Sequence, residues 1–100
     1  LLAEARGVLD CRLVLCEAGI IGEQPDTPHN ALLVEYNACV ARLASDFDAV
    51  LAPMNAAFWR VITGNPGRAW TTDGVHPLSN GHMLMALTLF DALEQVETDS

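Results

Sequence analysis

The short apolar run RLVLC, at residues 12–16, is rich in branched side chains. A second run of the same kind, DAVLA at residues 48–52, is followed directly by Pro53. Runs of this length without polar alternation are typical of strands that are buried on both faces of a parallel sheet. We therefore predict two short strands, each covered on both sides.

Helical patterns lie on both sides of these runs. The expected helices cover residues 1–6, 31–45, 54–62 and 79–96. The helix over 31–45 shows apolar residues at three- and four-residue steps, and Asn30 is the expected N-cap. Strands that alternate with helices indicate an α/β sandwich with a parallel sheet.

The number of strands raises a problem for this fold. A chain of 100 residues is enough for one small domain with one core. Two strands that are buried on both faces cannot form a sheet alone, because each needs neighbours. We therefore expect that further strands belong to the same domain, or that another copy of the chain supplies them.

Composition and charge exclude several classes of function. Hydrophobic residues make up 51% of the chain and charged residues 18%, which is the balance of a folded domain. Five basic against 13 acidic residues give a net charge of −8, so we expect no nucleic-acid partner. No apolar run approaches the roughly 20 residues of a membrane span. The first residues also lack the pattern of a signal peptide.

The three cysteines, Cys11, Cys16 and Cys39, do not form a recognisable metal or redox motif. No C-x-x-C is present, and the count is odd. We predict that all three are reduced and buried as small apolar side chains. This mildly favours a reducing compartment such as the cytoplasm.

The residues with the clearest chemical potential are DGVHP, at positions 73–77. Gly74 permits a backbone conformation that most residues resist, and Pro77 keeps His76 out of the following helix. Such a turn can aim the Asp73 carboxylate at Nδ1 of His76, which leaves Nε2 as a general base. An Asp-x-x-His turn is also a common local hydrogen-bonding device, so a purely structural role is the alternative.

This block, together with Gly81 and the apolar helix after it, resembles the last conserved block of the SGNH (GDSL) hydrolases. These are serine esterases, lipases and deacetylases. The resemblance covers about residues 1–95 and implies a three-layer α/β/α sandwich with a flavodoxin-like parallel sheet. It implies that residues 1–96 are the C-terminal half of one such domain, whose N-terminal strands are missing, and that residues 97–100 are a polar tail.

The resemblance also implies roles for two residues. Asp73 and His76 correspond to the orienting acid and the general base of a Ser-His-Asp triad, which needs no cofactor. The family's serine lies in a Gly-Asp-Ser block that this chain lacks, and Ser45, Ser79 and Ser100 have no strand-end context. We therefore expect a partner half of the domain to supply the serine, and the chain alone to be inactive. The implied substrate is a small ester, either an acyl lipid or an acetylated sugar.

Other residues near the block have weaker cases. Trp70 and Val75 are expected to line the substrate, although packing beneath the turn is an alternative for Trp70. A metal site made of Asp73, His76 and His82 matches no standard ligand spacing, so we expect no metal. Surface, capping or loop roles are expected for Glu17, His29, Arg60 and Arg68.

A function of a different class is also open. The chain could be a non-catalytic α/β module that associates with a partner, or with itself, through an exposed sheet edge. The small number of strands and the absence of a nucleophile both motivate this alternative.

Overall fold

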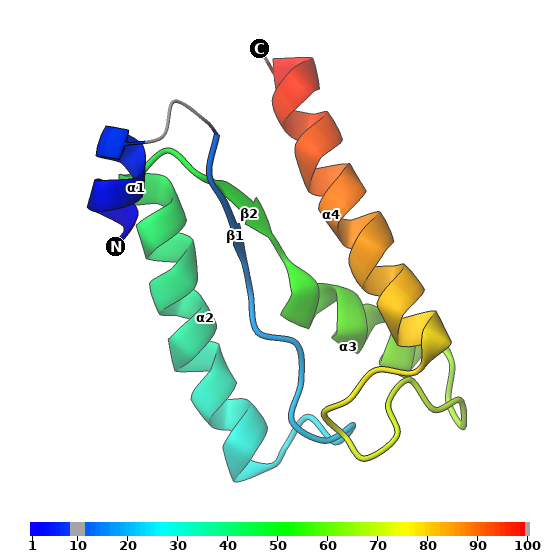
Figure 1. Ribbon diagram of the computed structural model, residues 1–100. Helices are drawn as coiled ribbons and strands as arrows, with labels where there is room; N and C mark the ends of the chain where they lie inside the picture. The colour runs from blue at the N-terminus through cyan, green and yellow to red at the C-terminus, as the bar shows by residue number, and fades with distance from the viewer. Residues whose placement is uncertain (9–11, 100) are drawn as a thin grey trace.

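The computed structural model describes residues 1–8 and 12–99. Its elements, in chain order, are α1 (Leu2–Val8), β1 (Val14–Cys16), α2 (Pro28–Asp46), β2 (Val50–Ala52), α3 (Met54–Gly64) and α4 (Ser79–Asp99) (Figure 1). This order of helices and strands confirms the predicted α/β class.

The two strands pair in parallel, as the sequence predicted. Val14 lies opposite Val50, and Cys16 lies opposite Ala52. Helix α2 connects the strands and contacts both of them, whereas α4 contacts β2 and α3. The strands therefore lie between α2 and α4, in the order helix, sheet, helix (Figure 1). The complete three-layer sandwich stays a prediction, because the sheet of the described residues has two strands.

The core is small and lies between β2 and α4. Its buried members are Val50, Ala52, Met54 and Ala92, against which half-buried apolar side chains pack. The radius of gyration of 14.7 Å exceeds the value of about 13 Å that is usual for a compact domain of this length. The chain is thus an open arrangement rather than a closed globule.

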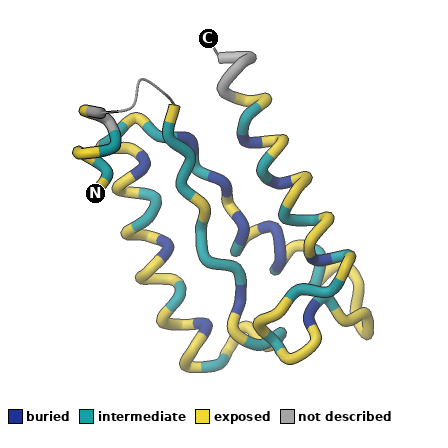
Figure 2. Tube along the Cα trace, viewed as in Figure 1, coloured by how far each residue is buried: buried dark blue, intermediate teal, exposed yellow. Residues whose placement is uncertain are grey.

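Strand β1 differs from its prediction, because it is not buried on both faces. Val14 and Leu15 are only half-buried and Cys16 is exposed, whereas Val50 and Ala52 of β2 are buried (Figure 2). Within the described part of the chain, β1 pairs with β2 alone. The prediction that β1 is covered on both faces was therefore wrong for the described residues.

Two helices expose apolar stripes. On α4, Met83, Leu87 and Phe90 are 66%, 57% and 64% exposed and follow one another at four- and three-residue steps. On α2, Leu32 and Tyr36 are exposed in the same way. Contiguous exposed apolar positions of this kind mark surfaces that another element or chain covers.

The helix boundaries correct two details. The N-cap of α2 is Thr27, whose hydroxyl accepts from the backbone N–H of Asn30 at 3.3 Å, so the prediction that Asn30 is the cap was wrong. Helix α4 continues to Asp99, so residues 97–99 of the predicted polar tail are helical. None of the helices in the described ranges is long and apolar enough to cross a membrane.

The predicted burial of the cysteines was wrong where it can be compared. Cys16 and Cys39 are both exposed, and Cys11 lies outside the described residues. Cys16 ends β1, which among the described residues pairs with β2 alone, and Cys39 lies on an exposed face of α2. Apolar composition alone therefore did not predict the exposure of these two side chains.

Candidate active site

The predicted site lies in the loop between α3 and α4. An isolated antiparallel bridge joins Thr71 to Pro77, and the backbone N–H of Leu78 donates to the carbonyl of Trp70 at 2.9 Å. These contacts fold the loop back on itself, so residues 73–76 form its tip. The tip is therefore held by regular backbone pairing at its base.

The structure brings Asp73 and His76 together at this tip. Asp73 Oδ2 lies 2.7 Å from His76 Nδ1, and Oδ1 accepts from the backbone N–H groups of Val75 at 3.0 Å and His76 at 2.9 Å. An ionised carboxylate can only accept, so Nδ1 carries the proton and the lone pair of the neutral ring lies on Nε2. The side chain of His76 is 77% exposed and that of Asp73 is 54% exposed, so both are open to solvent.

Hydrogen bonding keeps the Asp73 carboxylate charged. The backbone N–H groups of His76 and Val75, and then the His76 ring, hold the pKa of Asp73 well below its usual range. Asp73 is therefore an anion at every pH at which an imidazole could act as a base.

Gly74 is required at the tip for two reasons. Its φ is +95°, a conformation that side chains resist. A Cβ at this position would also lie 2.8 Å from Cα of Gly22, whose N–H donates to the Gly74 carbonyl at 2.7 Å. The glycine of the DGVHP motif thus lets this loop contact the loop that follows β1.

The loop after β1 is fastened by a buried asparagine that the sequence analysis misread. Asn30 Oδ1 accepts from the Ile21 N–H, and Nδ2 donates to the carbonyls of Ile21 and Gly22 at 2.8 and 3.1 Å. A third donation reaches the Gln24 carbonyl at 2.8 Å. Asn30 Nδ2 also donates to the Thr27 hydroxyl at 3.2 Å, so part of its bonding is local to the start of α2. Its bonds to Ile21 and Gly22 reach back nine and eight residues, and no local sequence pattern distinguishes such a clamp from an N-cap.

Two further side-chain amides support the same loop. Asn37 accepts from the Ala18 N–H at 2.9 Å, and Asn55 donates to the Gly19 carbonyl at 2.7 Å. Glu17 accepts from the Asn55 N–H at 3.2 Å at the start of α3, which confirms its expected capping role. The loop is therefore ordered by side chains from both flanking helices.

Trp70 and Val75 lie close to the pair but differ in exposure. Trp70 is half-buried, and its Nε1 has no hydrogen-bond partner among the described residues. Val75 is exposed at the tip and borders an apolar cavity of about 310 Å³ whose walls include Ile21, Phe58 and Pro77. Val75 and Pro77, the residues on either side of His76 in the sequence, therefore both line an apolar hollow.

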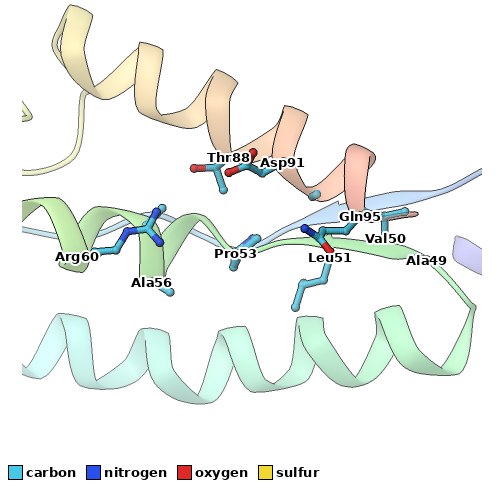
Figure 3. Close-up of a pocket in the computed structure, with 11 residues that line it drawn as sticks. Ala49, Val50, Leu51, Pro53, Ala56, Arg60, Thr88, Asp91 and Gln95 are labelled. Atoms are coloured by element: carbon cyan, nitrogen blue, oxygen red, sulfur yellow. The ribbon is translucent and has the colours of Figure 1, made fainter. Parts of the chain in front are cut away.

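The remaining candidates lie apart from the pair. His82 is exposed on the first turn of α4, and the described residues hold no group of three potential ligands that could bind a metal ion. A cavity of about 470 Å³ lies beside β2 between α3 and α4, with Arg60, Thr88 and Asp91 in its wall (Figure 3). None of the predicted site residues lines that cavity.

No family model matches the chain, and no curated protein matches it in sequence. Among solved structures it is similar to Axe2, an acetylxylan esterase from Geobacillus stearothermophilus, with a TM-score of 0.81 and 22% identity. It is also similar to LAE5, an α/β hydrolase enzyme from the metagenome of Lake Arreo, Spain, with a TM-score of 0.81 and 20% identity. The chain has the fold of these enzymes. The predicted resemblance to esterases is thereby confirmed at the level of the fold.

The match covers most of this chain but less than half of each of the two similar chains. It covers 91% of this chain but 41% of each of those two chains. Three further Axe2 structures carry single substitutions described as catalytic mutants, of a serine near the start of that chain and of an aspartate and a histidine three positions apart. In this chain, Asp73 and His76 are also three positions apart.

Proposed function

We propose that this chain is the C-terminal part of an SGNH-type ester hydrolase, to which it contributes the acid and the base of a Ser-His-Asp triad. The observation that carries the proposal is the 2.7 Å contact between Asp73 Oδ2 and His76 Nδ1, in a chain with the fold of an acetylxylan esterase. The spacing of the catalytic aspartate and histidine in Axe2 supports the same assignment.

In this mechanism His76 moves the proton and Asp73 holds the ring. The hydroxyl oxygen of a serine attacks the ester carbonyl while Nε2 of His76 takes the hydroxyl proton. The same nitrogen then protonates the leaving alcohol, which departs and leaves an acyl-serine. Water attacks this acyl group, gives one proton to Nε2, and the acid leaves as the serine recovers its proton. Asp73 stabilises the charged imidazolium in both halves of the cycle.

The serine is supplied from outside these 100 residues. Within the described part of the chain, no serine hydroxyl is hydrogen-bonded to His76. Ser45 lies in the last turn of α2 and Ser79 begins α4. The segment that carries the nucleophile also supplies the strand beside β1, so that one segment completes both the site and the sheet.

The proposed substrate is a small ester, an acyl lipid or an acetylated sugar. The cavity of about 310 Å³ beside Val75 has room for a short acyl group. Val75 and Trp70 are proposed to line the substrate, Val75 through this hollow and Trp70 from the base of the loop.

A fluorophosphonate probe tests the proposal. The natural protein is purified through a tag after Ser100, and its intact mass is measured before and after treatment with the probe. The expected result is an adduct on a serine that precedes this segment, in the same or an associated polypeptide. A control with His76→Ala should lose the adduct. A single unlabelled species, with the 10.8 kDa mass of this chain plus that of the tag, would overturn the proposal.

The second candidate is a non-catalytic module that associates through the outer edge of β1. The exposed strand and the apolar stripes on α2 and α4 favour it. Size-exclusion chromatography with light scattering tests this second candidate, since a folded monomer would count against it.

A further inference from the structure

A carboxylate outside the DGVHP motif holds the base of the loop. Glu23 lies in the segment after β1, 48 residues before Thr71. Its Oε2 accepts from the backbone N–H of Thr71 at 3.1 Å, from the Thr71 hydroxyl at 2.6 Å and from the Trp70 N–H at 3.3 Å. Bonds to an ionised acceptor are roughly twice as strong as neutral ones. Glu23 therefore holds the Trp70–Thr71 segment, at the start of the loop, through strong hydrogen bonds.

Thr71 passes this constraint to the tip. Its hydroxyl proton points to Glu23, because a carboxylate can only accept. A lone pair of the same oxygen is then free to accept from the Gly74 N–H, at 2.9 Å. Thr71 is buried, so this hydroxyl cannot exchange its partners for bulk water. The result is a directed chain from Glu23 through Thr71 to the residue after Asp73.

A second contact holds the tip from the same side. The Gly22 N–H donates to the Gly74 carbonyl at 2.7 Å, and the Gly22 carbonyl accepts from Asn30 at 3.1 Å. Both polar groups of the Gly74 backbone are thus fixed by the Gly22–Glu23 segment, one directly and one through Thr71. Helix α2 in turn anchors that segment through Asn30.

We propose that Glu23 is a positioning residue for the Asp73–His76 pair, acting through Thr71. The inference rests on the proposed function, in which His76 Nε2 must face the serine hydroxyl. Glu23 makes no hydrogen bond to Asp73 or His76, so its action is to fix where the tip lies. A displacement of about 1 Å at a catalytic group can cost on the order of a hundredfold in rate.

Four substitutions in the complete enzyme test the kinetic consequence. Thr71→Val removes the relay hydroxyl and keeps the shape, whereas Thr71→Ser keeps the hydroxyl and should restore function. Glu23→Gln removes the charge from a half-buried residue, and Glu35→Gln is the matched control on the exposed side of α2. We expect kcat to fall about tenfold or more in Thr71→Val and Glu23→Gln, with KM within about twofold. Thr71→Ser and Glu35→Gln should stay within about twofold of the parent in both constants.

A second readout does not depend on the serine. In the full 100-residue chain, ring ¹⁵N shifts of His76 report which nitrogen carries the proton. The parent should show the form protonated at Nδ1, and Glu23→Gln should shift the ring toward the mixture of both forms seen in a free histidine. Glu35→Gln should leave the parent signal unchanged. Far-UV circular dichroism checks that each variant is folded. If Thr71→Val does not fold, Glu23→Gln alone tests the proposal.

The outcomes separate the two proposals. Absence of hydrolysis in the parent, with a ring signal that changes in Glu23→Gln, would overturn the ester hydrolase and support the positioning role. Hydrolysis and a ring signal that both stay unchanged in Glu23→Gln would overturn the role of Glu23. A parent chain whose His76 already shows the mixture would overturn it as well.

Discussion

At the scale of single residues, Asp73 is held by more than its partner ring. Two backbone N–H groups bind one carboxylate oxygen, and His76 Nδ1 binds the other. The aspartate can therefore keep its orientation when the ring moves or becomes charged. This arrangement suits a residue that must orient a base through a complete catalytic cycle.

The two histidines near the loop should behave differently. In the complete enzyme, His76→Ala should lower kcat/KM by about a thousandfold or more, because Nε2 is the only proposed proton carrier. His82→Ala should leave turnover nearly unchanged, since this side chain is exposed on α4. Steady-state kinetics with a chromogenic acetyl ester checks both, and equal losses would refute the assigned roles.

The low pKa of Asp73 should survive removal of its partner ring. Backbone N–H groups are the largest cause of the depression, and His76→Ala keeps both of them. In His76→Ala, we expect a carboxyl ¹³C titration to show that Asp73 is still ionised below a pH of about 4, which is where an ordinary aspartate becomes protonated. A return to the ordinary pKa in His76→Ala would mean that the ring alone causes the depression.

The sign of the pH effect on stability follows from the same shift. The folded pKa of Asp73 lies below the unfolded value, so the folded state is favoured fully above the unfolded pKa. This contribution is lost as the pH falls from about 4 through the folded pKa. Acid unfolding of the parent and of Asp73→Asn, followed by circular dichroism, should differ most above that window.

At the scale of elements, two loops form the site jointly. The loop after β1 and the loop before α4 meet at Gly22 and Gly74, where the backbones are hydrogen-bonded directly. Asparagine side chains from α2 and α3 hold the first loop. Because the first loop is fixed to both helices, the placement of α2 and α3 also fixes the position of the Asp73–His76 tip.

Replacing the glycine at this contact should separate the loops. Gly74→Ala places a Cβ 2.8 Å from Gly22 Cα in addition to a positive φ, whereas Gly67→Ala meets a positive φ in open space. We expect Gly74→Ala to cost about 2–3 kcal/mol in free energy of unfolding and Gly67→Ala about 1 kcal/mol. Urea unfolding measures both, and equal costs would show that the contact carries no weight.

At the scale of the whole molecule, the chain exposes several large apolar side chains. The match to known esterases covers 41% of their length, and β1 has a neighbour on one side within the described residues. The apolar stripe on α4 is also exposed to solvent. These features agree with a chain that is completed by a further segment.

The α4 stripe should make the isolated chain self-associate. Light scattering at tens of micromolar should give an average mass above 10.8 kDa, because apolar patches of this kind pair in water. Leu87→Gln with Phe90→Gln should lower the mass toward that of a monomer. Val34→Gln is the control, since Val34 is equally exposed but isolated on α2, and an equal effect there would contradict the role of the stripe.

Local patterns were enough for several features. Element type follows from apolar spacing and turn chemistry within a few residues, so the order of helices and strands was predicted before the structure. The Asp73–His76 contact was predicted because the two residues are three positions apart. Gly74 between them and Pro77 after them also restrict where the two side chains can lie. These local patterns therefore account for the α/β order and for the pairing of Asp73 with His76.

The residues that support this pair, and the surfaces that stay exposed, become apparent only in the folded chain. Glu23 and Thr71 are 48 residues apart, and no local pattern links a loop carboxylate to a buried threonine. The predicted burial of β1, Cys16 and Cys39 was wrong because burial depends on what packs against an element, and apolar composition alone does not report it. Contacts between distant segments and the coverage of each face are properties of the folded chain as a whole.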